Sequence, residues 1–193
     1  MSAVTPPASF AQSRILDASS QKIWMQVLLV IAGTAILALA AKVQVPFFPV
    51  PMTLQTLAIF VISAAYGRNL AVATMVLYLI EGLAGLPVFA GFVAGPAYMM
   101  GPTGGYLAGF VVAAFIIGSA ADAGWSRSPL KMAGAMLVGA AAIFALGFAW
   151  LATIIGAQSA FTAGVLPFVL ADLVKVAIAS LLVAALWKVF RKG

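Results

Sequence analysis

An acid and a base lie three positions apart near the start of the last long apolar stretch of the chain. Asp172 and Lys175 are surrounded, from Val165 to Trp187, by almost wholly apolar residues. On a helix, residues three apart share one face and can pair. Charged side chains in an apolar run of membrane-spanning length are costly and usually face a protein interior or a watery cavity. The pair therefore predicts an interior polar site; the alternative is a structural ion pair between helices.

A third charged residue, Glu81, is the other acid inside an apolar run. If its helix begins near Asn69, Glu81 lies about 18 Å along that helix. This depth falls within the hydrocarbon core of a bilayer, which is about 30 Å thick. We therefore expect Glu81 to meet Asp172 and Lys175 at one level.

Uncharged polar residues that suit such a site begin a shorter apolar run. Gln55 offers an amide group there, and Thr53 and Thr56 offer hydroxyl groups. The alternative is that these residues cap a helix that begins near the membrane interface.

Aromatic residues in the connections between apolar runs offer the apolar walls that are typical of small-molecule pockets. The candidates are Phe47, Phe48, Phe89, Tyr98 and Tyr106. The alternative for these residues is anchoring at the membrane interface, which aromatic side chains favour.

The composition is that of an integral membrane protein. Hydrophobic residues make up 65% of the chain and charged residues 7%, whereas soluble domains are roughly half apolar and a quarter charged. At about 20 residues per span, the 193 residues leave room for six or seven spans and their loops. We predict one transmembrane substrate-binding domain over residues 23–193, after a flexible cytoplasmic tail, 1–22, that lacks the apolar core of a signal peptide.

Several classes of function are excluded by composition. The chain has no Cys and no His, which removes thiol nucleophiles, imidazole bases and most transition-metal sites, and we expect no metal and no cofactor. A membrane enzyme would have to use Ser, Lys and carboxylates; Ser180 is five residues from Lys175 and off its face, so we expect no enzymatic activity. The net charge of +6 comes from residues that punctuate apolar runs, so no nucleic-acid surface is predicted.

The chain divides into six apolar runs, which are predicted to be transmembrane helices. They cover residues 24–41, 53–66, 70–86, 104–120, 132–155 and 165–190. The connection 43–52 is rich in proline, which cannot continue a helix, so it is predicted to be a stiff loop over the mouth of a site. The connection 87–103 is predicted to be an apolar loop shielded from lipid, and 156–164 a short polar turn. The fifth run, 132–155, is interpreted as scaffold.

Small residues are concentrated on two of the runs. Gly105, Gly109 and Ala113 recur every four residues and predict a helix face that packs closely on another helix. The first run carries Ala32, Ala35 and Ala38, which predict a similar close approach. For this alanine face, packing within the chain and packing against a partner subunit are both open.

The cations are distributed unequally between the two predicted sides of the membrane. One side receives eight of them and the other only Lys42, with Lys175 inside a span; the eight are Arg14, Lys22, Arg68, Arg127, Lys131, Lys188, Arg191 and Lys192. Positive residues concentrate on the cytoplasmic side. Both termini are therefore predicted to be cytoplasmic, which requires an even number of spans, and six fits the length.

Four segments in this order resemble the BioY family, the biotin-binding S components of energy-coupling factor (ECF) vitamin transporters. They are residues 49–56, residues 85–90, residues 101–107 with Gly109 and Phe110, and residues 166–168 with Asp172 and Lys175. The resemblance implies an all-α integral membrane protein of six transmembrane helices in the cell membrane that captures biotin for uptake. It also implies partners: a transmembrane coupling subunit, which the alanine face would contact, and two ATP-binding subunits.

The chemistry of biotin suits the predicted site. Its ureido ring has two N–H donors and one carbonyl oxygen, which match Asp172 as acceptor and Lys175 as donor. Lys42, the only cation predicted on the outer side apart from Lys175, would attract the biotin carboxylate; the alternative is a lysine that snorkels at the end of a span. Two other readings stay open: an S component for a different vitamin, and a solitary biotin carrier that works without an ATPase module.

Overall fold

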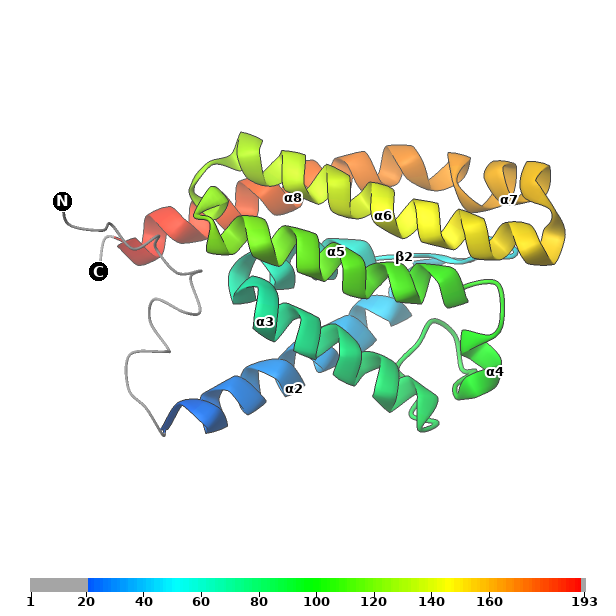
Figure 1. The fold of residues 1–193 in the computed structure, drawn as a ribbon, viewed down its shortest axis with the longest axis horizontal. Coiled ribbons are helices and arrows are strands. Elements are labelled where there is room, and N and C mark those ends of the chain that lie inside the picture. Colours follow the sequence, from blue (N-terminus) through cyan, green and yellow to red (C-terminus); the bar gives the residue numbers. More distant parts are fainter. Residues whose placement is uncertain (1–20, 192–193) are drawn as a thin grey trace.

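The computed structural model describes residues 21–191, most of them in helices packed side by side (Figure 1). The helices are α2 (Gln21–Lys42), α3 (Gln55–Leu83), α4 (Pro96–Met99), α5 (Gly104–Asp122), α6 (Pro129–Ile155), α7 (Ala157–Gly164) and α8 (Leu166–Arg191), with a 3-10 helix η1 (Trp125–Arg127). The predicted tail, 1–22, lies outside the described residues except for 21 and 22, which begin α2. The cations Arg14 and Lys192 also lie outside them.

Five of the described helical stretches are long and apolar enough to cross a membrane. Large apolar side chains lie on their outer surfaces, for example Leu39 of α2, Val138 of α6 and Leu170 of α8, which are 70%, 56% and 74% exposed. Lipid tails can cover such side chains, whereas water cannot do so without cost. The prediction of a mainly helical integral membrane fold is confirmed.

Helix α3 consists of two helical segments that fold back on each other at Gly67. The backbone of Gly67 has φ 75° and ψ 176°, a conformation that is almost restricted to glycine. The Gln55 amide donates a hydrogen bond of 2.8 Å to the Tyr78 hydroxyl, 23 residues further on. In a straight helix these residues would be about 34 Å apart. The predicted runs 53–66 and 70–86 are therefore two antiparallel halves of α3.

Close contact between α5 and α6 depends on the small residues that the sequence singled out. A Cβ atom on Gly105 or Gly109 would collide with the α6 backbone, at Leu146 and Ile143 respectively. Ala113 is fully buried. The predicted close-packing face on α5 is thus confirmed, and it brings α6 against the helices that carry the polar site.

The two ends of the helix bundle differ in structure. The reversal at Gly67 lies near η1, where the Ser126 hydroxyl donates to the Ala64 carbonyl and the Asp122 carboxylate accepts from the Arg68 backbone N–H. The described ends of α2 and α8 lie at the same end of the molecule, at the left of Figure 1. The opposite end carries α4, α7 and the 43–54 segment.

Two connections at this opposite end differ from the sequence predictions. Residues 156–164 were predicted to be a polar turn, and this is wrong: 157–164 form α7, because only Gly156, at φ 82°, interrupts a stretch that is otherwise compatible with a helix. The proline-rich connection contains a short antiparallel pair, β1 (Gln44–Val45) and β2 (Met52–Thr53), in which Gln44 faces Thr53. The hairpin holds the prolines between its strands, so the loop lies back against the bundle.

Candidate functional site

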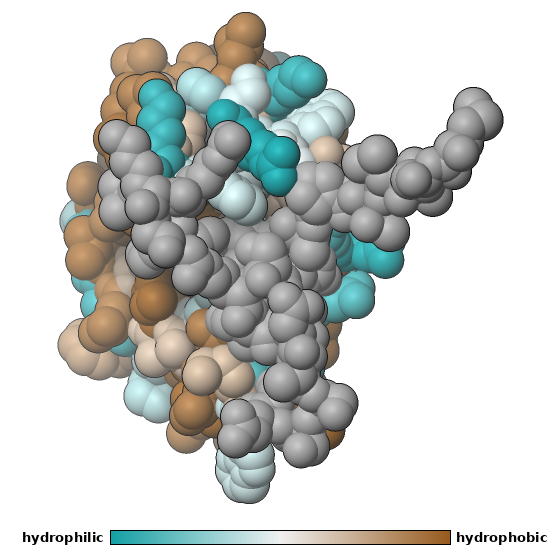
Figure 2. Space-filling model, turned by 90° about the vertical axis from the view of Figure 1, so that its left-hand side faces the viewer, coloured by the Kyte–Doolittle hydropathy of each residue, from teal (hydrophilic) through white to brown (hydrophobic). Residues whose placement is uncertain are grey.

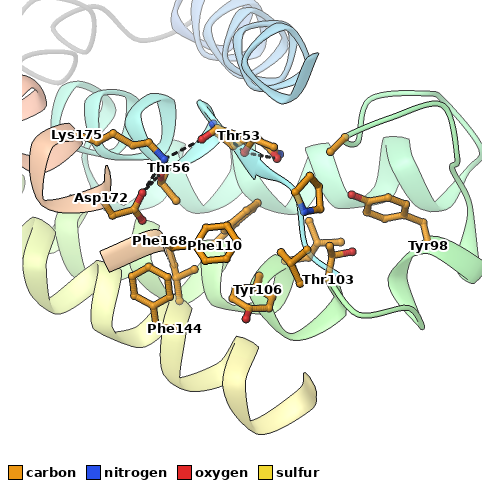
Figure 3. A pocket seen from close by; sticks show the side chains of 16 residues that line it. Thr53, Thr56, Tyr98, Thr103, Tyr106, Phe110, Phe144, Phe168, Asp172 and Lys175 are labelled. Atoms are coloured by element: carbon orange, nitrogen blue, oxygen red, sulfur yellow. Dashed lines mark hydrogen bonds and ion pairs between the residues drawn. The ribbon is translucent and has the colours of Figure 1, made fainter. Parts of the chain in front are cut away.

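The acid and base of α8 form one polar cluster with the start of α3 (Figure 3). Lys175 Nζ lies 2.7 Å from Asp172 Oδ1. The Thr56 hydroxyl donates to the same carboxylate oxygen at 2.9 Å. Asp172 and Lys175 are 4% and 9% exposed, so both charges are removed from the surface and held by each other.

The hydrogen bonds of Lys175 use all three of its protons. Besides Asp172, Nζ donates to the Thr56 hydroxyl at 2.9 Å and to the Thr53 carbonyl at 2.8 Å. An ammonium group has three donors and no acceptor. Asp172 Oδ1 receives both bonds of the carboxylate, and among the described residues no donor reaches Oδ2. The cluster therefore leaves one carboxylate oxygen of Asp172 for a ligand, whereas Lys175 can bind a ligand oxygen only by exchanging a bond.

The cluster lines an inner cavity of about 60 Å³. Its wall is mainly apolar and aromatic, with a few polar groups at one side, as is typical of small-molecule sites. The lining residues are Val50, Pro51, Thr53, Gln55, Thr56, Ala90, Tyr98, Thr103, Tyr106, Leu107, Phe110, Ile143, Phe144, Phe168, Asp172 and Lys175.

A larger outer hollow of about 450 Å³ adjoins the inner cavity. The two share four lining residues, namely Pro51, Ala90, Tyr98 and Thr103. The remaining wall of the outer hollow comes from the β-hairpin connection, from α4 and from the loops on either side of α4. The shared residues therefore separate the small compartment beside the polar cluster from a wider one.

Three of the predicted site residues line the inner cavity beside the ion pair. Gln55 is 5% exposed and its amide donates to the Tyr78 hydroxyl, which in turn donates to the Val88 carbonyl at 2.8 Å. The Tyr106 hydroxyl donates to the Gly164 carbonyl at 2.7 Å, so this side chain presents its ring to the cavity. Burial raises the pKa of the Tyr98 phenol against weaker opposing hydrogen bonds, so Tyr98 stays neutral at physiological pH.

Three other predicted site residues lie outside both hollows. Phe89 is fully buried behind the wall, stacked on Tyr98 at 4.8 Å between ring centroids. Lys42 Nζ donates to the carbonyls of Phe89 and Gly91, at 2.8 and 2.7 Å, and so holds the loop that follows α3. Glu81 accepts a hydrogen bond of 3.0 Å from Thr34 of α2. The expectation that Glu81 meets Asp172 and Lys175 in one site is wrong, because its side chain points toward α2.

The alanine face of α2 is divided. Ala32 and Ala35 are exposed, whereas Ala38 is partly buried against the core of the protein. The buried side of α2 is formed instead by residues such as Gly33, Thr34 and Leu37. Two of the three alanines are therefore accessible to a partner.

Sequence reasoning missed the contribution of α6 to the cavity wall. Ile143 and Phe144 line the cavity, although the fifth run was interpreted as scaffold. Thr103 of the connection before α5 was missed as well. An apolar side chain that faces a cavity has the same sequence signature as one that faces another helix, so no signal could have separated these residues from packing.

Comparison with known proteins connects this geometry with one family. Residues 12–192 match the sequence pattern of the BioY family. The probable biotin transporter BioY of Pyrococcus horikoshii is 38% identical over 154 residues, which cover 80% of this chain and 91% of that protein. The biotin transporter BioY of Thermotoga maritima is 36% identical over 159 residues, with coverage of 80% and 91%.

A solved structure shares the fold. The crystal structure of the S-component for biotin from an ECF-type ABC transporter superposes with a TM-score of 0.77, covering 89% of this chain and 95% of that one. Its sequence identity is 22%, so this likeness speaks for the fold alone. The match over residues 12–192, the two relatives and the shared fold agree, and the chain belongs to the BioY family.

Proposed function

We propose that this protein is a multi-pass protein of the cell membrane that captures biotin for uptake, as the S component of an ECF-type transporter. Its relatives are biotin transporters. The observation that carries the proposal is the Asp172 carboxylate, which is buried beside an apolar cavity with one oxygen that no described residue occupies.

The inner cavity suits the ureido head of biotin. Asp172 Oδ2 accepts an N–H of the ureido ring, a charge-assisted hydrogen bond that is stronger than a neutral one. Lys175 holds the carboxylate in place and reaches the ureido oxygen by exchanging its bond to Thr56 or Thr53. Phe110, Phe144 and Phe168 surround the sulfur-containing ring with apolar surface.

The acidic tail of biotin extends into the outer hollow. Lys42 has one proton left after its bonds to Phe89 and Gly91, and Gly91 lines this hollow. We assign this proton to the biotin carboxylate. The inner cavity of about 60 Å³ is smaller than the roughly 300–1,000 Å³ of ligand sites, so binding requires the shared wall at Tyr98 and Pro51 to move outward.

We assign six membrane spans with both termini in the cytoplasm. The support is the reversal of α3 at Gly67, which adds one crossing to the five apolar helices, and the position of Arg68, Arg127, Lys131 and Lys188 at one end of the bundle. Positive residues favour the cytoplasmic side. The cavity then opens to the outside, where biotin is captured.

The partners that we assign are a transmembrane coupling subunit and two ATP-binding subunits. The exposed alanines of α2, Ala32 and Ala35, allow a helix of the coupling subunit to approach closely. ATP hydrolysis belongs to these partners, and this chain acts as a transporter subunit without enzymatic activity of its own.

The test is mass spectrometry of the small molecules that the purified protein retains. Biotin should be retained in a one-to-one ratio after washing. When the protein is incubated with a mixture of water-soluble vitamins, biotin should be the one vitamin that it retains. Retention of another vitamin in its place would assign a different substrate. Biotin uptake by cells that express this chain with and without an ECF module then distinguishes a subunit from a solitary carrier.

A further inference from the structure

A third hollow, of about 440 Å³, lies at the end of the molecule opposite the candidate biotin site. Arg127 of η1 and Ala184, Trp187 and Lys188 of α8 line it. None of these residues takes part in the inner cavity or the outer hollow. Figure 2, which looks onto this end of the molecule, shows hydrophilic residues on part of this face and hydrophobic residues along one side of it.

Arg127 is held in place by the structure around it. The Ser126 hydroxyl, from a fully buried residue, donates to the Ala64 carbonyl at 3.1 Å and fixes η1 on α3. The Arg127 guanidinium then lies over the ring of Trp187, 5.4 Å from its centroid. A guanidinium that is already ordered on an aromatic face loses little entropy when it binds an anion.

The positive charge of the hollow has no ion-pair partner in the part of the chain that the structure describes. The ion pair between Asp172 and Lys175 is the one salt bridge among these residues. Two cations, Arg127 and Lys188, thus face one hollow, and neither forms an ion pair with a described carboxylate. The hollow is electrostatically complementary to an anion.

The surroundings of the hollow indicate which kind of anion fits. The hollow lies at the end of two apolar helices. Trp125 and Trp187 lie at the same level. Tryptophan favours the interface between the headgroups and the acyl chains of a membrane. Further along α8, Leu181 and Leu182 are 62% and 44% exposed and continue as an apolar surface. A ligand with an anionic head and an apolar tail would contact both regions.

We propose that this hollow binds the phosphate headgroup of an anionic phospholipid from the adjoining leaflet. The Arg127 guanidinium donates to the phosphate oxygens and Lys188 supplies the second positive charge. The acyl chains lie along the apolar surface of α8. The lipid would tie η1 to the end of α8, two elements that are in contact but are joined here by no ion pair of the described residues.

The test is a titration of the purified full-length protein with phosphatidylglycerol in a neutral detergent, read by native mass spectrometry. The wild type should bind phosphatidylglycerol more tightly than phosphatidylcholine. Arg127→Gln and Lys188→Gln should each weaken phosphatidylglycerol binding about fivefold, and the double variant about thirtyfold, with little change for phosphatidylcholine.

Lys131→Gln is the matched control, because Lys131 is an exposed cation at the same end that does not line the hollow. This variant should bind phosphatidylglycerol as the wild type does. If it lost as much phosphatidylglycerol binding as the Arg127 and Lys188 variants, the effect would come from general surface charge, and the proposal would be overturned. Competition by inorganic phosphate as effective as that by the lipid would assign the hollow to a free anion. If the double variant bound lipid as the wild type does but no longer co-purified with the coupling subunit, the hollow would be assigned to a protein partner.

Discussion

At the scale of single residues, Asp172 and Lys175 differ in how many of their hydrogen-bonding positions the protein already occupies. All three protons of Lys175 go to protein acceptors, whereas Asp172 keeps one oxygen without a described donor. Breaking a buried hydrogen-bonded charge pair from one side costs on the order of 2–5 kcal/mol, much of it because the other charge is left unpaired. We therefore expect the loss of Lys175 to weaken ligand binding even if its ammonium group does not touch the ligand.

Lys42→Met should weaken the binding of biotin more than the binding of biotin amide. The reason is that the remaining proton of Lys42 Nζ interacts with a carboxylate and gains little from a neutral amide. We expect a preferential loss of roughly tenfold, as for one charge-assisted hydrogen bond. Competition binding with both ligands measures it. Equal losses would mean that Lys42 only holds the carbonyls of Phe89 and Gly91.

The residues of the site differ in how well the sequence predicts them. Asp172 and Lys175 could be identified because charge is rare in an apolar run. The position of the Glu81 side chain could not be predicted, because depth along a helix says nothing about the direction in which a side chain points. The apolar wall residues Ile143 and Phe144 gave no signal at all, because packing and cavity lining use the same residue types.

At the scale of elements, the reversal inside α3 positions the site. It brings Thr53, Gln55 and Thr56 beside α8 and places Tyr78 behind Gln55. The sequence predicted two separate runs here with Gly67 between them. The prediction succeeded because glycine tolerates a backbone that other residues avoid.

Gly67→Ala should destabilise the protein by on the order of 1–3 kcal/mol, since φ 75° with ψ 176° is strained for any residue with a Cβ. Gly134→Ala is the matched control: Gly134 is helical with open space around it, and alanine there should be neutral or stabilising by up to about 1 kcal/mol. Thermal unfolding of both variants in detergent measures the difference. A Gly67→Ala protein as stable as the control would contradict the strained reversal.

Ala35→Trp should reduce co-purification of the coupling subunit by roughly tenfold or more, because a bulky ring prevents close helix approach. Biotin binding should stay unchanged, since Ala35 is exposed and remote from the cavity lining. Val138→Trp, on the exposed side of α6, is the control for added bulk. Equal co-purification of the two variants would place the partner on another face.

At the scale of the whole molecule, the two ends differ in structure and in charge. One end carries the inner cavity and the outer hollow beside the β-hairpin, α4 and α7, and the other carries Arg68, Arg127, Lys131 and Lys188. The order of the long helices was predictable from apolar runs, because lipid demands long apolar segments. The helix α7 was not, since eight residues with Ala, Gln, Ser and Thr fit a turn as well as a short helix.

The orientation can be tested with single cysteines, because the chain contains none of its own. Cysteine at Phe92, which is 97% exposed in the loop after α3, should react in intact cells with a maleimide that does not cross membranes. Cysteine at Lys131 should react only after the membrane is permeabilised. The reverse pattern would invert the assigned topology.

The central claim is that Asp172 binds the ureido head of biotin, and calorimetry with purified variants tests it most directly. Asp172→Asn keeps the size of the side chain but removes the charge, and affinity should fall by on the order of 2–5 kcal/mol. Glu81→Gln removes an acid of α3 that lies outside the cavity, and this variant should bind biotin as the wild type does. Wild-type affinity in a folded Asp172→Asn protein, or a steep loss in Glu81→Gln, would contradict the account.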